Sequence, residues 1–339
     1  MIKKPLLGKT KSELEQLANE LKMPSFAARQ IADWLYKKKV GTIDAMTNLS
    51  LDRREKLKEN YTVGRVDYSC RQASDDGTRK YLFPVSDDKF IETVFIPDKE
   101  RATICISSQG GCKMNCLFCM TGKQKFSSQL SSCEILNQIL SLPESEQLSN
   151  YVFMGMGEPL DNEVELFKAL EILTADYGLA LSPKRITVST VGILPKLKRL
   201  LEETRCHIAV SLHSPYHEER LSLVPMEKVY PAEKIIELLR RYDFSHQRRI
   251  SFEYILFGGL NDDRRHARDL VRFLSGIPCR VNLIKYHPVP GVDLPETNPE
   301  NMIPFRDYLS LHGIISTIRS SRGEDIFAAC GMLSGRTNS

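Results

Sequence analysis

The stretch GGCKMNCLFCMTG, residues 110–122, holds three of the nine cysteines in this 339-residue chain. Cys112, Cys116 and Cys119 form the pattern C-x3-C-x2-C shortly after an apolar run that is typical of a β-strand. Thiolates this close in sequence can converge on one soft metal centre because the loop folds back over it. Three protein ligands leave one iron of a four-iron cluster open to a substrate. We therefore predict a 4Fe-4S cluster bound by these three cysteines.

Two other interpretations of the three cysteines remain open from their spacing alone. A structural zinc site normally has a fourth Cys or His ligand nearby, and this loop contains no such residue. The remaining possibility is that the three thiols are buried close together without any metal.

Outward from the cysteine loop, apolar strand-like runs alternate with helical patterns as far as the C-terminus. The strand-like runs are residues 102–108, 150–154, 185–189, 206–212, 250–256 and 279–286. The helical stretches are residues 131–142, 162–176, 193–203, 231–242, 262–275 and 300–312. Alternating βα units imply a parallel sheet, because each crossover helix covers the sheet. Six units predict an α/β fold with a partial (βα)6 barrel.

Two smaller regions precede the barrel, which we assign to residues 98–339. Residues 1–62 have helical spacing, with a capping-box pattern at Thr10 and Glu13 and a third helix opening at Arg53, and we predict an N-terminal helical domain. That this domain binds RNA is implied only by the family resemblance described below. Residues 63–97 contain strand-like runs separated by turn signals at 75–77 and 86–88, which predict a β-hairpin extension.

The composition excludes several classes of protein. Lys and Arg number 47 against 43 Asp and Glu, a net charge of +4, so nucleic-acid affinity must come from local basic patches such as residues 37–39. The chain has no uncharged apolar run of about 18 residues and no signal-peptide pattern at its N-terminus. Clustered cysteines in a chain of this length are typical of a reducing compartment. We expect a cytoplasmic protein without a membrane span.

Six stretches together resemble the radical S-adenosylmethionine (SAM) RNA methyltransferases of the RlmN/Cfr family, and they occur in the family's order. They are CISSQGGCKMNCLFC (105–119), FMGMGEPLDN (153–162), RITVSTVGILP (185–195), AVSLHSP (209–215), VNLIKYHPVPG (281–291) and RSSRGEDIFAACG (319–331). The resemblance implies a radical SAM barrel with one 4Fe-4S cluster, whose open iron binds the amino and carboxylate groups of SAM. Reductive cleavage of SAM then gives a 5′-deoxyadenosyl radical.

The resemblance also implies which residues bind the cofactor. Gly157 and Glu158 match the family's Gly-Glu pair, which binds the amino group of SAM. The further matches to family cofactor contacts are Ser189, Ser211, Leu212 and His213. His287 stands where the family usually carries Asn, and we expect it to contact the cofactor as well.

Three matches concern catalysis. Cys330 matches the thiol that accepts a methyl group, and Cys105 matches the thiol that removes the ring proton and forms a disulfide with Cys330. Glu92 lies where the family is assigned a proton acceptor. Without the resemblance, Cys330 would be an ordinary thiol, Cys105 a core strand residue and Glu92 a solvent-facing strand residue.

The implied function is methylation of carbon 2 of adenine in 23S rRNA (adenosine 2503) and in tRNA (adenosine 37), with two SAM molecules per turnover. An electron donor of the flavodoxin or ferredoxin type and a monomeric chain are implied too. A Cfr-type methylation of carbon 8 remains an alternative because its catalytic residues are shared. A non-catalytic iron–sulfur RNA-binding protein is a further alternative, but binding alone needs neither Cys105 nor Cys330.

Overall fold

The computed structural model describes residues 3–85, 89–245 and 249–335. Its centre is a sheet whose parallel strands are β6 (Arg101–Cys105), β9 (Asn150–Phe153), β10 (Ile186–Thr190), β11 (His207–Ser211), β12 (Ile250–Leu256), β13 (Cys279–Lys285) and β14 (Ile315–Ile318). The sheet continues antiparallel through β5 (Lys89–Asp98), β4 (Arg79–Val85) and β3 (Cys70–Ala73). The spatial order is β14-β13-β12-β11-β10-β9-β6-β5-β4-β3, so ten strands form one sheet.

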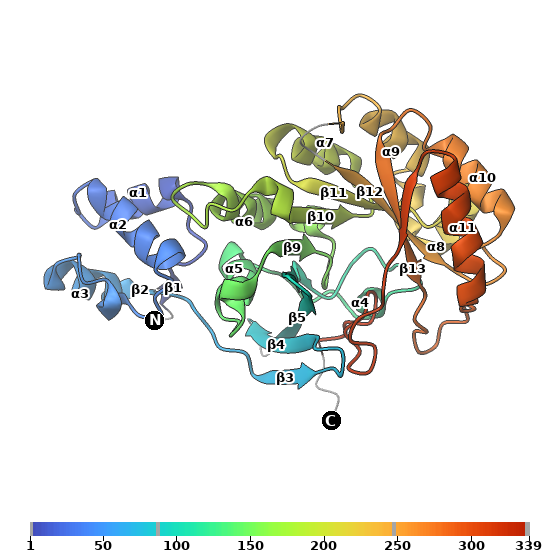
Figure 1. The fold of residues 1–339 in the computed structure, drawn as a ribbon. Coiled ribbons are helices and arrows are strands. Elements are labelled where there is room, and N and C mark those ends of the chain that lie inside the picture. The colour runs from blue at the N-terminus through green and yellow to red at the C-terminus, as the bar shows by residue number, and fades with distance from the viewer. Residues whose placement is uncertain (1–2, 86–88, 246–248, 336–339) are drawn as a thin grey trace.

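Helices connect the parallel strands and lie on the outer side of the curved sheet (Figure 1). They are α5 (Ser132–Leu140), α6 (Glu163–Thr174), α7 (Leu194–Glu203), α8 (His217–Leu223), α9 (Ala232–Leu239), α10 (Arg264–Phe273) and α11 (Pro299–Leu311). Ser131 begins α5 with a complete capping box to Glu134. All seven side chains of β12 are buried, as expected for a strand covered on both faces.

The partial barrel with six βα units is confirmed, with one addition. A strand that the sequence analysis missed, β14, follows the sixth helix and pairs with β13 in parallel. Its pattern is weak because it is a four-residue edge strand in which only Ser316 is buried and Ile315 is 54% exposed. Within the described ranges, no pairing joins β14 to β3, so the sheet stays open.

The N-terminal residues form a helical lobe beside the sheet (Figure 1). Its elements are β1 (Lys4–Pro5), α1 (Lys11–Glu20), α2 (Phe26–Ala32), a π-helical turn at Asp33–Lys37, α3 (Leu51–Asn60) and β2 (Tyr61–Thr62). The predicted capping box of Thr10 and Glu13 is present at α1. The third helix begins at Leu51, two residues before the predicted start at Arg53.

The predicted β-hairpin extension is an antiparallel edge of the same sheet. β4 pairs with both β3 and β5, and β5 pairs with β6 of the barrel. The turn expected at 75–77 joins β3 to β4, whereas the turn expected at 86–88 lies outside the described residues. The short elements of the cysteine loop are β7 (Gln109–Gly110), α4 (Met120–Lys123) and β8 (Ser128–Gln129).

Short 3-10 turns complete the described structure, at Ile43–Ala45, Ser145–Gln147, Pro159–Asn162, Pro183–Arg185 and Pro225–Lys228. None of the helices in the described part of the chain is both long enough and apolar enough to cross a membrane.

Two isoleucines on strands of the same sheet give a matched test of the fold. Ile208 in β11 is fully buried, whereas Ile315 in β14 is 54% exposed. We expect Ile208→Ala to lower the free energy of unfolding by about 2–5 kcal/mol because it leaves a cavity in the core. Ile315→Ala is expected to change it by about 0.5 kcal/mol or less. Urea denaturation of both variants measures the difference, and equal losses would contradict the described sheet order.

Candidate active site

The carboxyl ends of the parallel strands meet at one edge of the sheet and enclose an inner cavity of about 150 Å³. Loops that follow β6, β9, β10 and β11 supply most of its wall. The predicted residues that line it are Cys112, Cys116, Cys119, Gly157, Glu158, Ser189, Ser211, His213 and Cys330. The structure therefore brings together nine predicted positions from well-separated parts of the chain.

The three clustered thiols all face this inner cavity. Cys116 is buried, and Cys112 and Cys119 are partly buried. Burial raises the pKa of Cys112 to about 12, because a thiolate is poorly solvated here. In the described ranges, no group of three Cys, His, Asp or Glu side chains is placed to hold one metal ion. A single zinc ion needs its ligands to converge on one point, whereas each thiolate of an iron–sulfur cluster can bind its own iron.

Glu158 is anchored at the end of β9 by three donors. Thr190 Oγ1 lies 2.6 Å from the carboxylate, and the N–H groups of Val191 and Leu160 donate to it at 2.9 and 3.1 Å. Burial outweighs these hydrogen bonds and raises the pKa of Glu158 to about 7. The carboxylate is therefore held in place but would gain from a cationic partner.

Gly157 has a positive φ of +98°. A Cβ at this position would meet the side chain of Gln109 at 2.5–2.8 Å, so no larger residue fits. The same Gln109 accepts a hydrogen bond from the Glu158 N–H at 2.8 Å. The glycine thus lets the chain turn closely against the cysteine loop and present Glu158 to the cavity.

His213 carries an unpartnered nitrogen at the inner cavity. Its Nδ1 accepts the N–H of Ile255 at 3.1 Å, while its buried Nε2 has no hydrogen-bond partner among the described residues. The residue has φ +61°, an uncommon conformation for a side-chain-bearing residue. Burial, with Arg220 nearby, lowers the pKa of His213 to about 3, so the ring is neutral. Because Nδ1 accepts a hydrogen bond, the ring hydrogen is on Nε2 and is available to a ligand. Leu212 beside it, also predicted to contact the cofactor, is buried and does not line the inner cavity.

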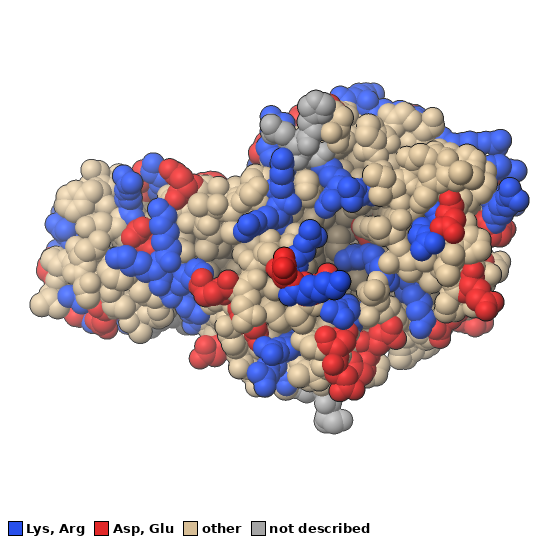
Figure 2. Space-filling model, in the orientation of Figure 1, with Lys and Arg blue, Asp and Glu red and all other residues tan. Residues whose placement is uncertain are grey.

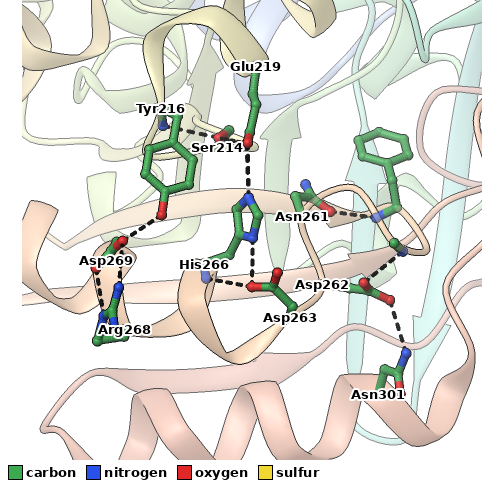
Figure 3. Close-up of polar contacts among 12 residues, drawn as sticks. Ser214, Tyr216, Glu219, Asn261, Asp262, Asp263, His266, Arg268, Asp269 and Asn301 are labelled. Carbon is green, nitrogen blue, oxygen red and sulfur yellow. Dashed lines mark hydrogen bonds and ion pairs between the residues drawn. The ribbon is translucent and has the colours of Figure 1, made fainter.

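A polar network that includes Ser214, Glu219 and His266 lies behind the loop that follows β11 (Figure 3). The amide of Asn261 donates to the His213 carbonyl at 2.7 Å. His266 lies between Asp263 and Glu219, with ring nitrogens 2.8 and 3.0 Å from their oxygens. Ser214, next to His213, donates to Glu219 at 2.6 Å. The loop after β11 is therefore fastened to α8 and α10.

Arg220 ties together the loops that follow β10 and β11. It is fully buried and forms an ion pair with Glu227, which is also buried. Its guanidinium donates to the carbonyls of Val191, Ser211 and Leu212 at 2.8, 3.0 and 3.2 Å. A buried charge with this many partners is a positioning element for the cofactor-facing loops.

An outer cavity of about 390 Å³ lies beside the inner one. The two cavities share the wall residues Cys119, Met154, Gly155, Ile284, Arg319, Cys330 and Gly331. Cys105 and His287 line the outer cavity only. His287, expected to contact the cofactor, has its Nε2 2.9 Å from Ser321 Oγ in this outer wall.

The two remote thiols differ in their surroundings. Cys330 is exposed, whereas Cys105 at the end of β6 is buried, and burial raises the pKa of Cys105 to about 12. Arg319 lines both cavities, and its Nη1 lies 3.3 Å from a carboxylate oxygen of Glu253. The cation is thus held beside the wall that contains Cys330.

Glu92 lines neither cavity. Its side chain is buried on β5, where one oxygen lies 3.0 Å from Nζ of Lys80. The other oxygen accepts the N–H groups of Ser334 and Gly335 at 2.6 and 3.0 Å. The carboxylate expected to act on the substrate is engaged by the chain's own C-terminal segment.

Several residues of the site were missed by the sequence analysis. Glu253 offered a signal, because a carboxylate inside the apolar run ISFEYIL is unusual in a buried parallel strand. Thr190, Arg220 and Asn261 offered none, since polar residues at a strand end, in a helix or in a loop are ordinarily solvated.

The residues of the inner cavity fit an iron–sulfur cluster with SAM. Three cavity-facing thiols can take up iron, which would offset the cost of burying thiolates. The Glu158 carboxylate suits an ammonium group, and the free Nε2–H of His213 can donate to an oxygen or nitrogen of a ligand.

Comparison with known proteins agrees with these features. The model of the Radical SAM superfamily matches residues 106–271, and the model of the ribosomal RNA large subunit methyltransferase N-terminal domain matches residues 4–63. A "Probable dual-specificity RNA methyltransferase RlmN" from Parabacteroides distasonis is 58% identical, covering 99% of this chain and 98% of the relative.

Two further likenesses extend over the same length. The "Dual-specificity RNA methyltransferase RlmN" of Halorhodospira halophila is 41% identical, covering 97% of this chain and 93% of the relative. The crystal structure of a radical SAM methyltransferase from Sphaerobacter thermophilus superposes with a TM-score of 0.92 at 37% identity, covering 98% of this chain and 99% of that one.

The ion pair beneath the site gives a test of its architecture. We expect Arg220→Met to lower the free energy of unfolding by about 3–5 kcal/mol, because Glu227 is then buried without its cation. The double variant Arg220→Met/Glu227→Gln is expected to regain part of that loss. Urea denaturation of the wild type and both variants measures it, and a double variant no more stable than the single one would contradict the argument.

Proposed function

Because this chain belongs to the RlmN family of radical SAM RNA methyltransferases, we propose that it methylates carbon 2 of an adenine in 23S rRNA and in tRNA. The relatives' shared name, dual-specificity RNA methyltransferase, supports an RNA substrate of two kinds. The match of residues 4–63 to a ribosomal RNA methyltransferase domain supports the rRNA assignment.

The observation that carries the proposal is that Cys330 lies in the walls of both cavities. A methyl-carrying thiol must receive its group on one side and deliver it on the other. The inner cavity contains the residues suited to the cluster and SAM. The outer cavity falls within the range of about 300–1,000 Å³ typical of ligand pockets and suits an adenine flipped out of an unstacked RNA.

When bound, the 4Fe-4S cluster and SAM supply an electron, a methyl group and a 5′-deoxyadenosyl radical. Cys112, Cys116 and Cys119 would hold the cluster. Glu158 would hold the amino group of SAM, while Ser189, Ser211 and His213 would position the rest of it. Arg220 keeps the loops that carry these residues together.

The chain's two remote thiols perform the transfer. The Cys330 thiolate would displace the methyl group of one SAM: a carbon–sulfur bond forms at Cys330 while the methyl–sulfonium bond breaks, and S-adenosylhomocysteine is the leaving group. Loss of one hydrogen atom to the radical leaves a thiomethylene radical, which adds to the electron-poor carbon 2 of adenine. The adduct gives up one electron, which the oxidised flavodoxin- or ferredoxin-type partner would accept, and the ring proton passes to the Cys105 thiolate. Once Cys105 has released that proton, its sulfur attacks the Cys330 sulfur. A disulfide forms, the carbon–sulfur bond to Cys330 breaks, and the freed carbon takes up a proton to give the methyl group of the released RNA.

RNA approach is supported by the distribution of charge. Figure 2 shows Lys and Arg side chains on the N-terminal lobe and around the hollow beside it. On the lobe, Arg53 lies over the half-exposed ring of Phe26 and Lys38 lies 3.6 Å from the ring centre of Trp34. Basic groups paired with aromatic rings suit phosphates and unstacked bases.

We extend the proposal to the setting of the reaction. Reductive cleavage of SAM needs a one-electron donor, for which a flavodoxin or ferredoxin is the suitable class. We also propose a monomeric enzyme. Ribosomal RNA and tRNA as substrates imply the cytoplasm.

The position of the methyl group tests the function. Anaerobically reconstituted protein, with SAM, a reductant and 23S rRNA or tRNA, is expected to yield 2-methyladenosine by liquid chromatography and mass spectrometry. Cys112→Ala is expected to lose the iron, about four atoms per chain, and to give no product. Finding 8-methyladenosine instead would assign the carbon-8 activity, and iron-loaded protein that methylates neither RNA would contradict the proposal.

The roles of the two remote thiols can be separated. Once the thiomethylene carbon has bonded to adenine, protein and RNA are joined through Cys330, and release needs the sulfur of Cys105. Cys105→Ala is therefore expected to accumulate a protein–RNA cross-link that survives denaturation. Denaturing gels with labelled RNA reveal it, and the cross-link should vanish in Cys105→Ala/Cys330→Ala. Normal turnover by Cys105→Ala would exclude this role.

A further inference from the structure

The segment that carries Cys330, residues 322–335, contains neither a helix nor a strand. A segment without backbone ladders depends on other groups for its conformation. Figure 1 shows it, in red, beside α4 and the antiparallel edge of the sheet. Its side toward α4 is held by backbone contacts, since the N–H of Met120 donates to Gly331 and the hydroxyl of Thr121 donates to Leu333.

The start of the Cys330 segment is fastened to the turn between β3 and β4. Asp325 accepts the hydroxyl of Ser74 at 2.6 Å and the N–H of Asp75 at 3.3 Å. Asp76 in turn accepts the N–H of Gly323 at 3.0 Å. Although partial burial opposes it, hydrogen bonds from Thr78 and Gly323 lower the pKa of Asp76 to about 2. The turn therefore stays charged at neutral pH.

The middle and end of the segment are held by a buried ion pair. Lys80 on β4 and Glu92 on β5 lie on the same face of the sheet, because their ladder partners are Val94 and Leu82. Both side chains are buried, 5% and 1% exposed. Nζ of Lys80 lies 3.4 Å from the carbonyl oxygen of Phe327, three residues before Cys330.

Glu92 contacts the same segment on the other side of Cys330. Its Oε2 accepts the N–H groups of Ser334 and Gly335, while its Oε1 faces Lys80. Hydrogen bonds from N–H groups to a buried carboxylate are stronger than those to a neutral acceptor. Glu92 thus contacts the residues after the reacting thiol, and its ion-pair partner Lys80 contacts the residues before it.

We propose that Glu92, together with Lys80, is a positioning residue that holds the Cys330 segment on the antiparallel extension, so that the thiol lies between the two cavities. The proposal rests on the proposed function only in taking Cys330 as the reacting thiol. Glu92 then acts before RNA enters, through the conformation of residues 327–335. It does not take a proton from adenine.

Hydrogen exchange and alkylation of the anaerobically reconstituted full-length chain test this directly. In Glu92→Ala, backbone exchange in residues 327–335 is expected to accelerate by about tenfold or more, since two N–H groups lose their acceptor. The rate of Cys330 alkylation by iodoacetamide is expected to rise several-fold relative to exposed Cys70 in the same molecule. Glu92→Gln retains an acceptor oxygen. Its exchange and alkylation rates are expected to lie between those of the wild type and those of Glu92→Ala.

Glu144→Gln is the matched control. Glu144 is equally buried, accepts a hydrogen bond from Tyr81 on β4 at 2.7 Å and pairs with Arg79. Among residues 322–335, the described part of the Cys330 segment, it has no hydrogen-bond or ion-pair partner, since its side-chain partners are Arg79 and Tyr81. Exchange and alkylation in residues 327–335 are expected to stay at the wild-type rates. Because these measurements need no RNA, they remain decisive even if the RNA substrate is a different one.

Formation of S-methyl-Cys330 separates positioning from proton transfer. With SAM and reductant but no RNA, Glu92→Ala is expected to methylate Cys330 at least several-fold more slowly, measured by peptide mass spectrometry. Unchanged exchange, unchanged alkylation and normal Cys330 methylation, with loss only of the RNA product, would overturn the proposal and make Glu92 a group that acts on adenine.

A second variant keeps the test valid if Glu92→Ala does not fold. Asp325 is exposed, and among the described residues its side chain bonds to Ser74 and Asp75 in the turn between β3 and β4. Asp325→Ala should therefore leave the core intact. Exchange in residues 322–330 is expected to accelerate several-fold. If exchange matches the wild type in Asp325→Ala and also in Glu92→Gln, whose side chain keeps nearly the same shape, the extension does not position this segment and the proposal fails.

Discussion

The parallel pairing of the strands from β6 to β14 is the constraint on which the rest of the structure depends. In a parallel sheet each strand ends at the same edge, whatever the separation of the strands in sequence. The cysteine loop and Glu158 follow β6 and β9, Ser189 and Ser211 lie at the carboxyl ends of β10 and β11, and all of them line one cavity. The crossover helices make this possible by covering the sheet and returning the chain to its starting edge.

Exclusion of water gives that shared edge its chemical character. Burial raises the pKa values of Cys112 and Glu158 and lowers that of His213, so each group is shifted toward its neutral form in the protein alone. Cationic ligands reverse this preference for the thiols and the carboxylate. Among the residues that the structure describes, the buried thiols and the carboxylate of this site lack a cationic partner in the protein alone. Iron and an ammonium-bearing cofactor would supply one. The buried Arg220–Glu227 pair stabilises the loops while these ligands are absent.

The antiparallel extension has a different task from that of the parallel core. It covers no cofactor position, yet it contacts the Cys330 segment at its start, middle and end through Asp76, Lys80 and Glu92. The core binds what the reaction needs, and the extension holds the thiol that moves the methyl group. This division explains why a short three-stranded edge accompanies the barrel and shares its sheet.

The amino-acid sequence by itself determined the features that depend on neighbours along the chain. Cysteine spacing, strand and helix periodicity, and the capping box at Thr10 are local patterns, and all of them appear in the structure at or within a few residues of their expected positions. The resemblance then linked the remote Cys105 and Cys330 to the cysteine loop. In the parallel part of the sheet, as far as the structure describes it, β14 escaped the strand pattern, because a short, half-exposed edge strand carries little periodicity. The two-residue strands β1, β2, β7 and β8 are too short to show a pattern.

Tertiary structure alone decided which wall each group occupies. His287 lies in the outer cavity, and Glu92 meets Ser334, 242 residues further along the chain. In the sequence, Arg220 has the pattern of an ordinary surface residue of a charged helix. In the folded protein its guanidinium donates to three backbone carbonyls. Such contacts depend on strand register and on the packing of distant segments. They leave no spacing in the sequence from which their partners could be inferred.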